Sequence, residues 1–180
     1  MRCAPGTHEA AMSLLLRYNP PRSSVLDLAS GSGAMLARLG DNGFTDQQAA
    51  ELDIERCQLE RINPRLIDLN SEFCRQFDRR FALITAIEVS EHLDCPRHFL
   101  RQVWELLQDG GYLLLTTPNI SNWVGRIKFL LWGELRWFDE AQYHRQRHIS
   151  PLTDVYIWLM LNEIGFHLVD SSSAGDHSNA

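Results

Sequence analysis

A chain of 180 residues is long enough for one domain with a sizeable core and too short for two ordinary domains. A composition of 44% hydrophobic and 22% charged residues is typical of a globular protein and excludes the disordered and fibrous classes. The formal net charge of -6 excludes a global basic field for duplex DNA and leaves RNA as a partner only through a local basic patch.

Cysteine and apolar patterns predict a cytoplasmic protein. The four cysteines are scattered without a C-x-x-C pair, and the first residues show no secretory signal. The longest apolar runs are far shorter than the roughly 20 residues that span a bilayer, so we expect no transmembrane segment. We expect reduced thiols, one domain over residues 1–170 and a loose polar tail over residues 171–180.

The first half of the chain alternates helices and strands. Apolar side chains at helical spacing predict a helix over residues 7–18, which ends at Asn19-Pro20-Pro21. The elements expected after it are a buried strand over 25–28, a glycine turn over 29–33, a helix that ends at 40–43, a weak strand over 48–53, a third strand over 65–69 and a short helix over 71–77.

The second half continues this alternation. The apolar run over residues 81–87 predicts a strand that is covered on both faces of a parallel sheet. Asp94 is the expected N-cap of the next helix, which has Pro96 in its first turn and ends at Asp109-Gly110-Gly111. The remaining elements are a second buried strand over 112–117, a last long helix that opens at 147–153, and a strand over 166–170. The pattern predicts a doubly wound α/β fold.

The turn at residues 29–33 occupies the place where an open parallel sheet binds its ligand, at the carboxyl end of the first strand. Glycines there let the backbone approach a ligand closely. A dinucleotide site needs a third glycine where this sequence has Leu36. Asp27, two residues before the turn residue Ala29, suits instead a ligand with a cationic amine, such as the amino-acid end of S-adenosylmethionine (SAM).

The stretch Val25-Leu26-Asp27-Leu28-Ala29-Ser30-Gly31-Ser32-Gly33 resembles the first motif of class I SAM-dependent methyltransferases, with Ala29 in place of the first glycine. The resemblance implies a Rossmann-like, doubly wound, mostly parallel sheet with SAM at this turn. It also implies an acid on the ribose at the end of the second strand, for which Asp53 fits by pattern and Glu51 is the alternative. The cofactor-binding residues that it implies are Asp27, Ala29, Ser30, Gly31, Gly33, Asp53, Asp68, Leu69 and Ile87.

Two acids and a histidine directly follow the fourth strand. Glu88, Glu91 and His92 stand at positions i, i+3 and i+4, which share one face if a helical turn starts there. Carboxylates and imidazole suit Mg²⁺ or Mn²⁺, and such an ion would lower the pKa of an acceptor hydroxyl.

The run from Glu88 to Leu93 resembles the ubiquinone-biosynthetic and small-RNA 2′-O-methyltransferases. In the RNA group a later histidine completes the metal site, which implies His148 here. The four residues Glu88, Glu91, His92 and His148 are therefore our candidates for catalysis and for metal binding. A metal-free role of either histidine as general base or substrate orienter, or a histidine that only caps the turn, stays open.

Aromatic and basic residues alternate over residues 119–148, where the family places its substrate-specific insertion. They suit an unstacked base or a flat ring, or an amphipathic helix on a membrane surface. For Trp123, Ile127, Leu130 and Leu131, which stand at helical spacing, we favour plain packing onto the sheet.

We expect a SAM-dependent O-methyltransferase that acts on a small-molecule or glycan-like hydroxyl acceptor. The alternatives are an RNA 2′-O-methyltransferase and a non-catalytic SAM-binding protein. The family's seven-stranded sheet needs two strands after the last helix, and residues after 170 do not resemble one. We therefore expect the last strand to be missing, through truncation or donation by a partner, and a homodimer and peripheral membrane contact are compatible with the sequence.

Overall fold

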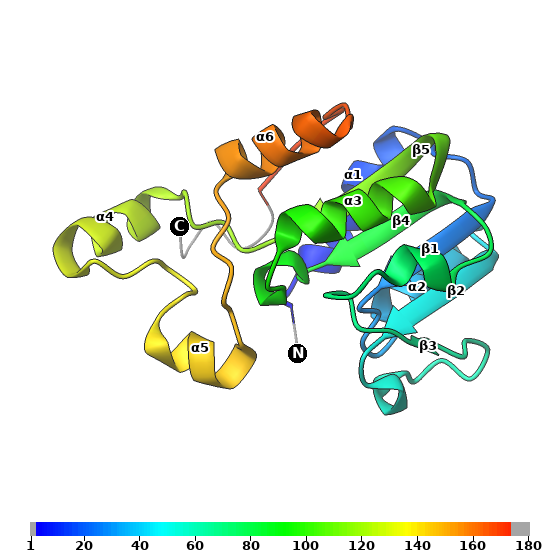
Figure 1. Ribbon diagram of the computed structural model, residues 1–180, viewed down its shortest axis with the longest axis horizontal. Coiled ribbons are helices and arrows are strands. Elements are labelled where there is room, and N and C mark those ends of the chain that lie inside the picture. The colour runs from blue at the N-terminus through cyan, green and yellow to red at the C-terminus, as the bar shows by residue number, and fades with distance from the viewer. Residues whose placement is uncertain (1–2, 174–180) are drawn as a thin grey trace.

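The computed structural model describes residues 3–173, and a parallel five-stranded sheet forms its centre (Figure 1). The strand order is β3-β2-β1-β4-β5. The strands are β1 (Ser24–Leu28), β2 (Asp46–Glu51), β3 (Arg65–Leu66), β4 (Phe81–Ile87) and β5 (Leu107–Thr116). The α-helices are α1 (Thr7–Arg17), α2 (Ala34–Asp41), α3 (Pro96–Leu106), α4 (Trp123–Trp132), α5 (Glu140–Gln146) and α6 (Asp154–Ile164), and three 3-10 turns are η1 (Ile54–Arg56), η2 (Phe73–Gln76) and η3 (Ser90–His92).

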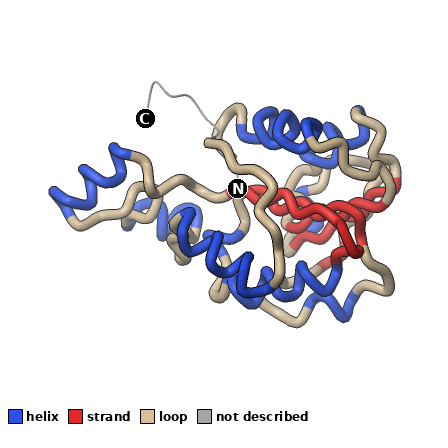
Figure 2. The backbone as a smooth tube through the Cα atoms, turned by 90° about the horizontal axis from the view of Figure 1, so that it is seen from above, coloured by secondary structure: helices blue, strands red, loops and turns tan. Residues whose placement is uncertain are grey.

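Helices cover both faces of the sheet, so the doubly wound fold is confirmed (Figure 2). β1 and β4 lie in the middle, where successive side chains enter opposite cores. Val25 and Leu83 pack with residues of α1 and α2, whereas Leu26 and Ile84 pack with residues of α3 and α6. This burial on both faces explains why β4 is an almost continuous apolar run and why β1 is apolar apart from Ser24 and Asp27.

β2 ends two residues before the predicted end of that strand. The carboxylate of Glu51 accepts the N–H groups of Leu52 (2.9 Å) and Asp53 (3.3 Å), which turns the chain out of the sheet. β3 has only two residues, so the predicted strand over 65–69 is too long. The helix expected over 71–77 is the short 3-10 turn η2.

The junction of α3 and β5 also differs from the prediction. Pro96 is the first residue of α3, because a proline without an N–H fits the first helical position, and Cys95 rather than Asp94 is the N-cap. β5 begins at Leu107, directly after α3. Asp109-Gly110-Gly111 therefore does not end the helix but forms an irregularity inside the strand, with Gly110 at φ 73°.

β5 is one of the two edge strands of the sheet within residues 3–173, and β3 is the other. The side chains of β5 are mostly half-exposed, so the prediction of a second fully buried strand is wrong. The strand predicted over 166–170 does not form either. Asp170 instead binds Tyr18 (2.9 Å) and Arg17 (3.1 Å) at the end of α1. Of the predicted tail, residues 171–173 are coil and residues 174–180 lie outside the described chain.

Residues 119–148, which we call the arm, carry α4 and α5 away from the sheet (Figures 1 and 2). The prediction that Trp123, Ile127, Leu130 and Leu131 pack onto the sheet is wrong. These side chains are 61%, 45%, 81% and 62% exposed. No helix of the described chain has the length and apolar character needed to cross a membrane.

Candidate active site

The turn after β1 combines unusual backbone with one buried acid. Ala29, Gly31 and Gly33 have φ values of 57°, 53° and 84°, all in the left-handed region. The N–H of Gly31 donates to Oε2 of Glu51 (2.7 Å), which joins the turn to the end of β2. A Cβ on Gly33 would lie 2.7 Å from Leu59, whereas a Cβ on Gly31 would meet no described atom within 4 Å beyond its chain neighbours. Gly31 therefore faces open space.

Two buried polar atoms at this turn lack a hydrogen-bond partner in the described chain, Oδ2 of Asp27 and Oγ of Ser30. The hydroxyl of Thr85 donates to the other Asp27 oxygen (2.6 Å). Burial raises the pKa of Asp27 to about 7; the Thr85 bond opposes this rise and the charge of Glu51 adds to it. Because buried polar atoms normally have partners, these two mark a place that can accept a ligand's donor groups.

We expect the ligand-free protein to lose stability as the pH rises from about 4 to about 7. The pKa of Asp27 rises from 3.8 to about 7 on folding, so the folded state binds more protons in this window. The contribution is complete below the lower pKa and is lost as the pH passes the upper one. Asp27→Asn should therefore raise the free energy of unfolding at pH 8, where each unit of pKa shift corresponds to about 1.4 kcal/mol.

Urea unfolding of both proteins at pH 5 and pH 8 measures this effect, with the fully exposed Asp109→Asn as the matched control. The Asp27 variant should gain stability over the wild type at pH 8 and gain less at pH 5. The same difference at both pH values would contradict the shift.

The other predicted cofactor residues lie near the carboxyl ends of β2, β3 and β4, on the same side of the sheet as the turn after β1. Glu51 ends β2 and is buried, whereas Asp53 lies two residues beyond the strand and is exposed. Asp68 follows β3 and is exposed, while Leu69 is buried in the core. Ile87 ends β4 and is half-buried.

A second polar group follows β4, which is the neighbour of β1 in the sheet. Glu91 lies in η3 with its side chain 1% exposed. Its backbone carbonyl accepts the N–H groups of Ile149 (2.9 Å) and Ser150 (3.0 Å). These bonds fasten the end of the arm to η3 and bring His148 beside His92, with 4.8 Å between the ring centroids.

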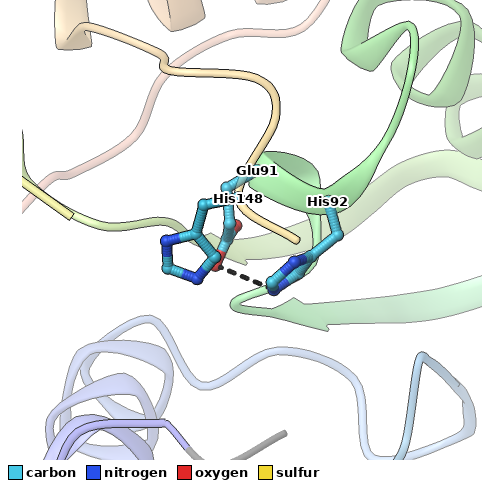
Figure 3. Close-up of side chains that lie close together, drawn as sticks. All are labelled: Glu91, His92 and His148. Carbon is cyan, nitrogen blue, oxygen red and sulfur yellow. Dashed lines mark ion pairs between the residues drawn. The ribbon is translucent and has the colours of Figure 1, made fainter. Parts of the chain in front are cut away.

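One ligand atom from each of Glu91, His92 and His148 lies within 4.8 Å of the others (Figure 3). Nδ1 of His92 faces the carbonyl of Arg147 (3.2 Å), and Nδ1 of His148 faces that of Trp137 (2.6 Å). A carbonyl oxygen only accepts, so each Nδ1 carries a hydrogen, and in the neutral form of either ring the lone pair is on Nε2. Nε2 of His92 lies 3.6 Å from Oε1 of Glu91.

Burial shifts the pKa values of Glu91 and His92 toward their uncharged forms. Burial, and then the nearby charge of Glu88, raises the pKa of Glu91 to about 8. Burial also lowers the pKa of His92. Oε2 of Glu91 accepts the hydroxyl of Thr117 (3.3 Å), while Oε1 is buried and has no hydrogen-bond partner in the described chain. Oε1 is thus available to a proton, a cation or a donor on a ligand.

Of the four predicted cluster residues, Glu88 is the one that is not grouped with the others, and its side chain binds Thr116 instead. The backbone of Glu88 has φ 53°, and its Oε1 accepts the hydroxyl of Thr116 (3.0 Å). The sequence placed it on one helical face with Glu91 and His92, but η3 begins only at Ser90. Glu88 therefore influences the cluster through its charge on Glu91.

Sequence reasoning missed the groups that orient the predicted residues. The carbonyls of Trp137 and Arg147 hold the two histidines, and backbone groups leave no mark in a sequence. Thr85 had a visible signal, because it is the polar residue in the apolar run of β4.

Comparison with known proteins adds a family to this geometry. The model of a family described as "Methyltransferase domain" matches residues 3–171. The ubiquinone biosynthesis O-methyltransferase of Rhodopseudomonas palustris (strain BisB18) is 27% identical over 140 residues, and the match covers 71% of this chain and 52% of that protein. The chain spans about half the length of the curated relatives it matches.

Solved structures share the fold at low identity. A SAM-dependent methyltransferase from Archaeoglobus fulgidus matches with a TM-score of 0.65 and 19% identity over 90% of this chain and 70% of that chain. Phosphoethanolamine N-methyltransferase 2 of Haemonchus contortus, solved with SAM, matches with a TM-score of 0.67 and 16% identity over 90% and 37% of the two chains. The predicted Rossmann-like class I fold is confirmed.

Proposed function

The chain belongs to the methyltransferase domain family, and from this premise we propose that it transfers the methyl group of SAM to a hydroxyl oxygen of a small-molecule acceptor. The observation that carries the proposal is the cluster of Glu91, His92 and His148 at the end of β4. β4 pairs with β1 in parallel, so the cluster and the glycine turn both lie at the carboxyl ends of the strands. A methyl donor at the turn would meet an acceptor at the cluster.

The turn fits the amino-acid end of SAM. Oδ2 of Asp27 and Oγ of Ser30 are buried acceptors without a described partner, and a cationic amine can donate to both. Gly31 leaves open space above the turn. We assign the ribose hydroxyls to Glu51 rather than Asp53, because Glu51 is the acid that touches the turn. Asp68, Leu69 and Ile87 remain our candidates for the adenine side of the site.

The histidines supply a base for the acceptor hydroxyl. Each ring is fixed by a backbone carbonyl through Nδ1, so Nε2 is ready to take a proton without a change of tautomer. Oε1 of Glu91 lies 3.6 Å from Nε2 of His92, so the ionised Glu91 carboxylate would stabilise the imidazolium that forms when His92 takes the proton. Removal of this proton makes the acceptor oxygen a nucleophile.

The same three side chains also fit a divalent cation. Histidine ligands of metals usually donate their second ring N–H to a carbonyl or carboxylate, as both rings do here. Oε1 of Glu91 offers an unpartnered buried oxygen. Two imidazoles beside one carboxylate suit Mn²⁺ better than Mg²⁺, which prefers oxygen ligands. A bound cation would lower the pKa of the acceptor hydroxyl.

Methyl transfer from labelled SAM to a panel of acceptors tests the proposal, with ortho-diphenols first because the matched Rhodopseudomonas relative is an O-methyltransferase of ubiquinone biosynthesis. Simple sugars and short RNAs with and without a terminal 2′-hydroxyl complete the panel. Methylation of a diphenol or sugar oxygen is the expected result. Transfer only to the RNA 2′-hydroxyl would favour the RNA enzyme, and SAM binding without any transfer would favour a non-catalytic protein.

A further inference from the structure

The outer face of α4 is apolar and uncovered. Trp123, Ile127, Leu130 and Leu131 share this face, and their exposed fractions lie between 45% and 81%. The two figures agree that α4 lies at the far end of the arm, away from the sheet (Figures 1 and 2). A surface helix normally packs its apolar face against the core, and an exposed apolar face marks an interaction site. We therefore expect this face to contact a partner outside the sheet.

The inner face of α4 shows that this orientation is built into the arm. Gly125 is buried, and a Cβ there would lie 2.9 Å from the carbonyl of Ile120. Lys128 binds Glu134 and Asp139, both at 3.2 Å. The small and polar residues therefore hold α4 to the rest of the arm, and the large apolar ones are left outside.

The chemistry of the outer face favours lipid over a nucleic-acid base. Three of its four side chains are aliphatic, and aliphatic groups do not provide the flat rings on which unstacked bases lie. Trp123 lies on this face at the start of α4, and tryptophan is enriched where a membrane meets water. At 10 residues α4 is about 15 Å long, too short to span a bilayer but long enough to lie in its surface.

The charge of the arm favours an anionic surface. Residues 119–148 contain five basic and three acidic side chains, a net charge of +2, in a chain whose net charge is -6. Arg126 is exposed on α4 next to the outer face, and Arg145 and Arg147 are exposed at the end of the arm. Basic side chains beside an inserted apolar face add attraction to anionic lipid headgroups.

We propose that the outer face of α4 inserts into the surface of anionic membranes and holds this protein there as a peripheral protein. The contact is independent of methyl transfer, so it can be measured without an acceptor. Sedimentation with vesicles of phosphatidylglycerol and phosphatidylcholine measures it, with pure phosphatidylcholine vesicles for comparison. Binding to the anionic vesicles should be at least tenfold tighter and should weaken as salt increases.

The decisive variant replaces two exposed residues that contribute nothing to a core, Leu130→Gln with Leu131→Gln. It should bind anionic vesicles at least tenfold more weakly and keep the wild-type thermal midpoint. The matched control is Val155→Gln with Leu159→Gln on α6, whose side chains are 63% and 46% exposed outside the arm, and it should bind as the wild type does.

Two results would overturn the proposal. In the first, the wild type does not sediment with anionic vesicles; a loss of single-stranded RNA binding or of dimer formation in the α4 variant would then assign this face to RNA or to a second copy of the chain. In the second, the α4 and α6 variants lose vesicle binding equally.

Discussion

Gly31→Leu is expected to weaken SAM binding by more than a hundredfold while the fold survives. A Cβ at this position would meet no described atom of the protein within 4 Å beyond its chain neighbours, so the cost to the fold comes from the positive φ of 53° and not from a clash at Cβ. The leucine side chain would instead fill the space above the turn in which we place the methionine end of SAM. Calorimetry with SAM and with S-adenosylhomocysteine measures the loss, because both ligands share that end.

The control for this variant is Gly110→Leu. Gly110 also has a positive φ, 73°, and a Cβ there would also meet nothing described within 4 Å, but it lies at the amino end of the sheet. The two variants therefore carry a similar backbone cost, and only the first obstructs the turn. SAM binding by Gly31→Leu within threefold of the control would refute our placement of the ligand.

His148→Ala is expected to lower turnover by at least a hundredfold and to leave the Kd for SAM within a few-fold. His148 is buried at the cluster and is fixed by the carbonyl of Trp137, whereas the glycine turn does not depend on it. Loss of kcat without loss of cofactor binding is the signature of a group that acts on the acceptor. The exposed His167→Ala should match the wild type in both measurements.

A metal readout separates the two chemistries of the cluster. Titration with Mn²⁺, followed by electron paramagnetic resonance without any substrate, should show a site in the wild type that His148→Ala lacks. Chelator should then abolish turnover. If Mn²⁺ does not bind and chelator has no effect, the histidines work as bases. Equal losses of SAM affinity and turnover in His148→Ala would mean that His148 only supports the structure.

The sequence predicts the centre of the fold well because burial leaves a strong pattern there. β4 has the predicted bounds, and the turn and helix after β1 are where their glycines and apolar residues indicate. The end of β2 was harder to place. Glu51 and Asp53 both fit the pattern of an acid after a strand, and only the backbone bonds of Glu51 decide where the strand stops.

The arm shows what periodicity leaves undetermined. The spacing of Trp123, Ile127, Leu130 and Leu131 correctly indicates one face of a helix, but spacing does not say what that face meets. Lys128 binds two residues that follow the helix, Glu134 and Asp139, and these ion pairs orient α4 within the arm. A local sequence pattern does not encode such contacts between charged side chains. Glu88 was misplaced for a related reason, since a helical face exists only where the helix has begun.

Two residues other than glycine carry left-handed backbone at neighbouring strand ends, Ala29 after β1 and Glu88 after β4. Such a conformation costs about 1 kcal/mol or more for a residue with a Cβ. Alanine and glycine codons differ by a single base, so one point mutation at position 29 can remove part of this strain. The relief is partly offset by the greater conformational entropy that glycine has in the unfolded chain. The ligand turn is thus a place where stability can change by a single substitution while the core stays as it is.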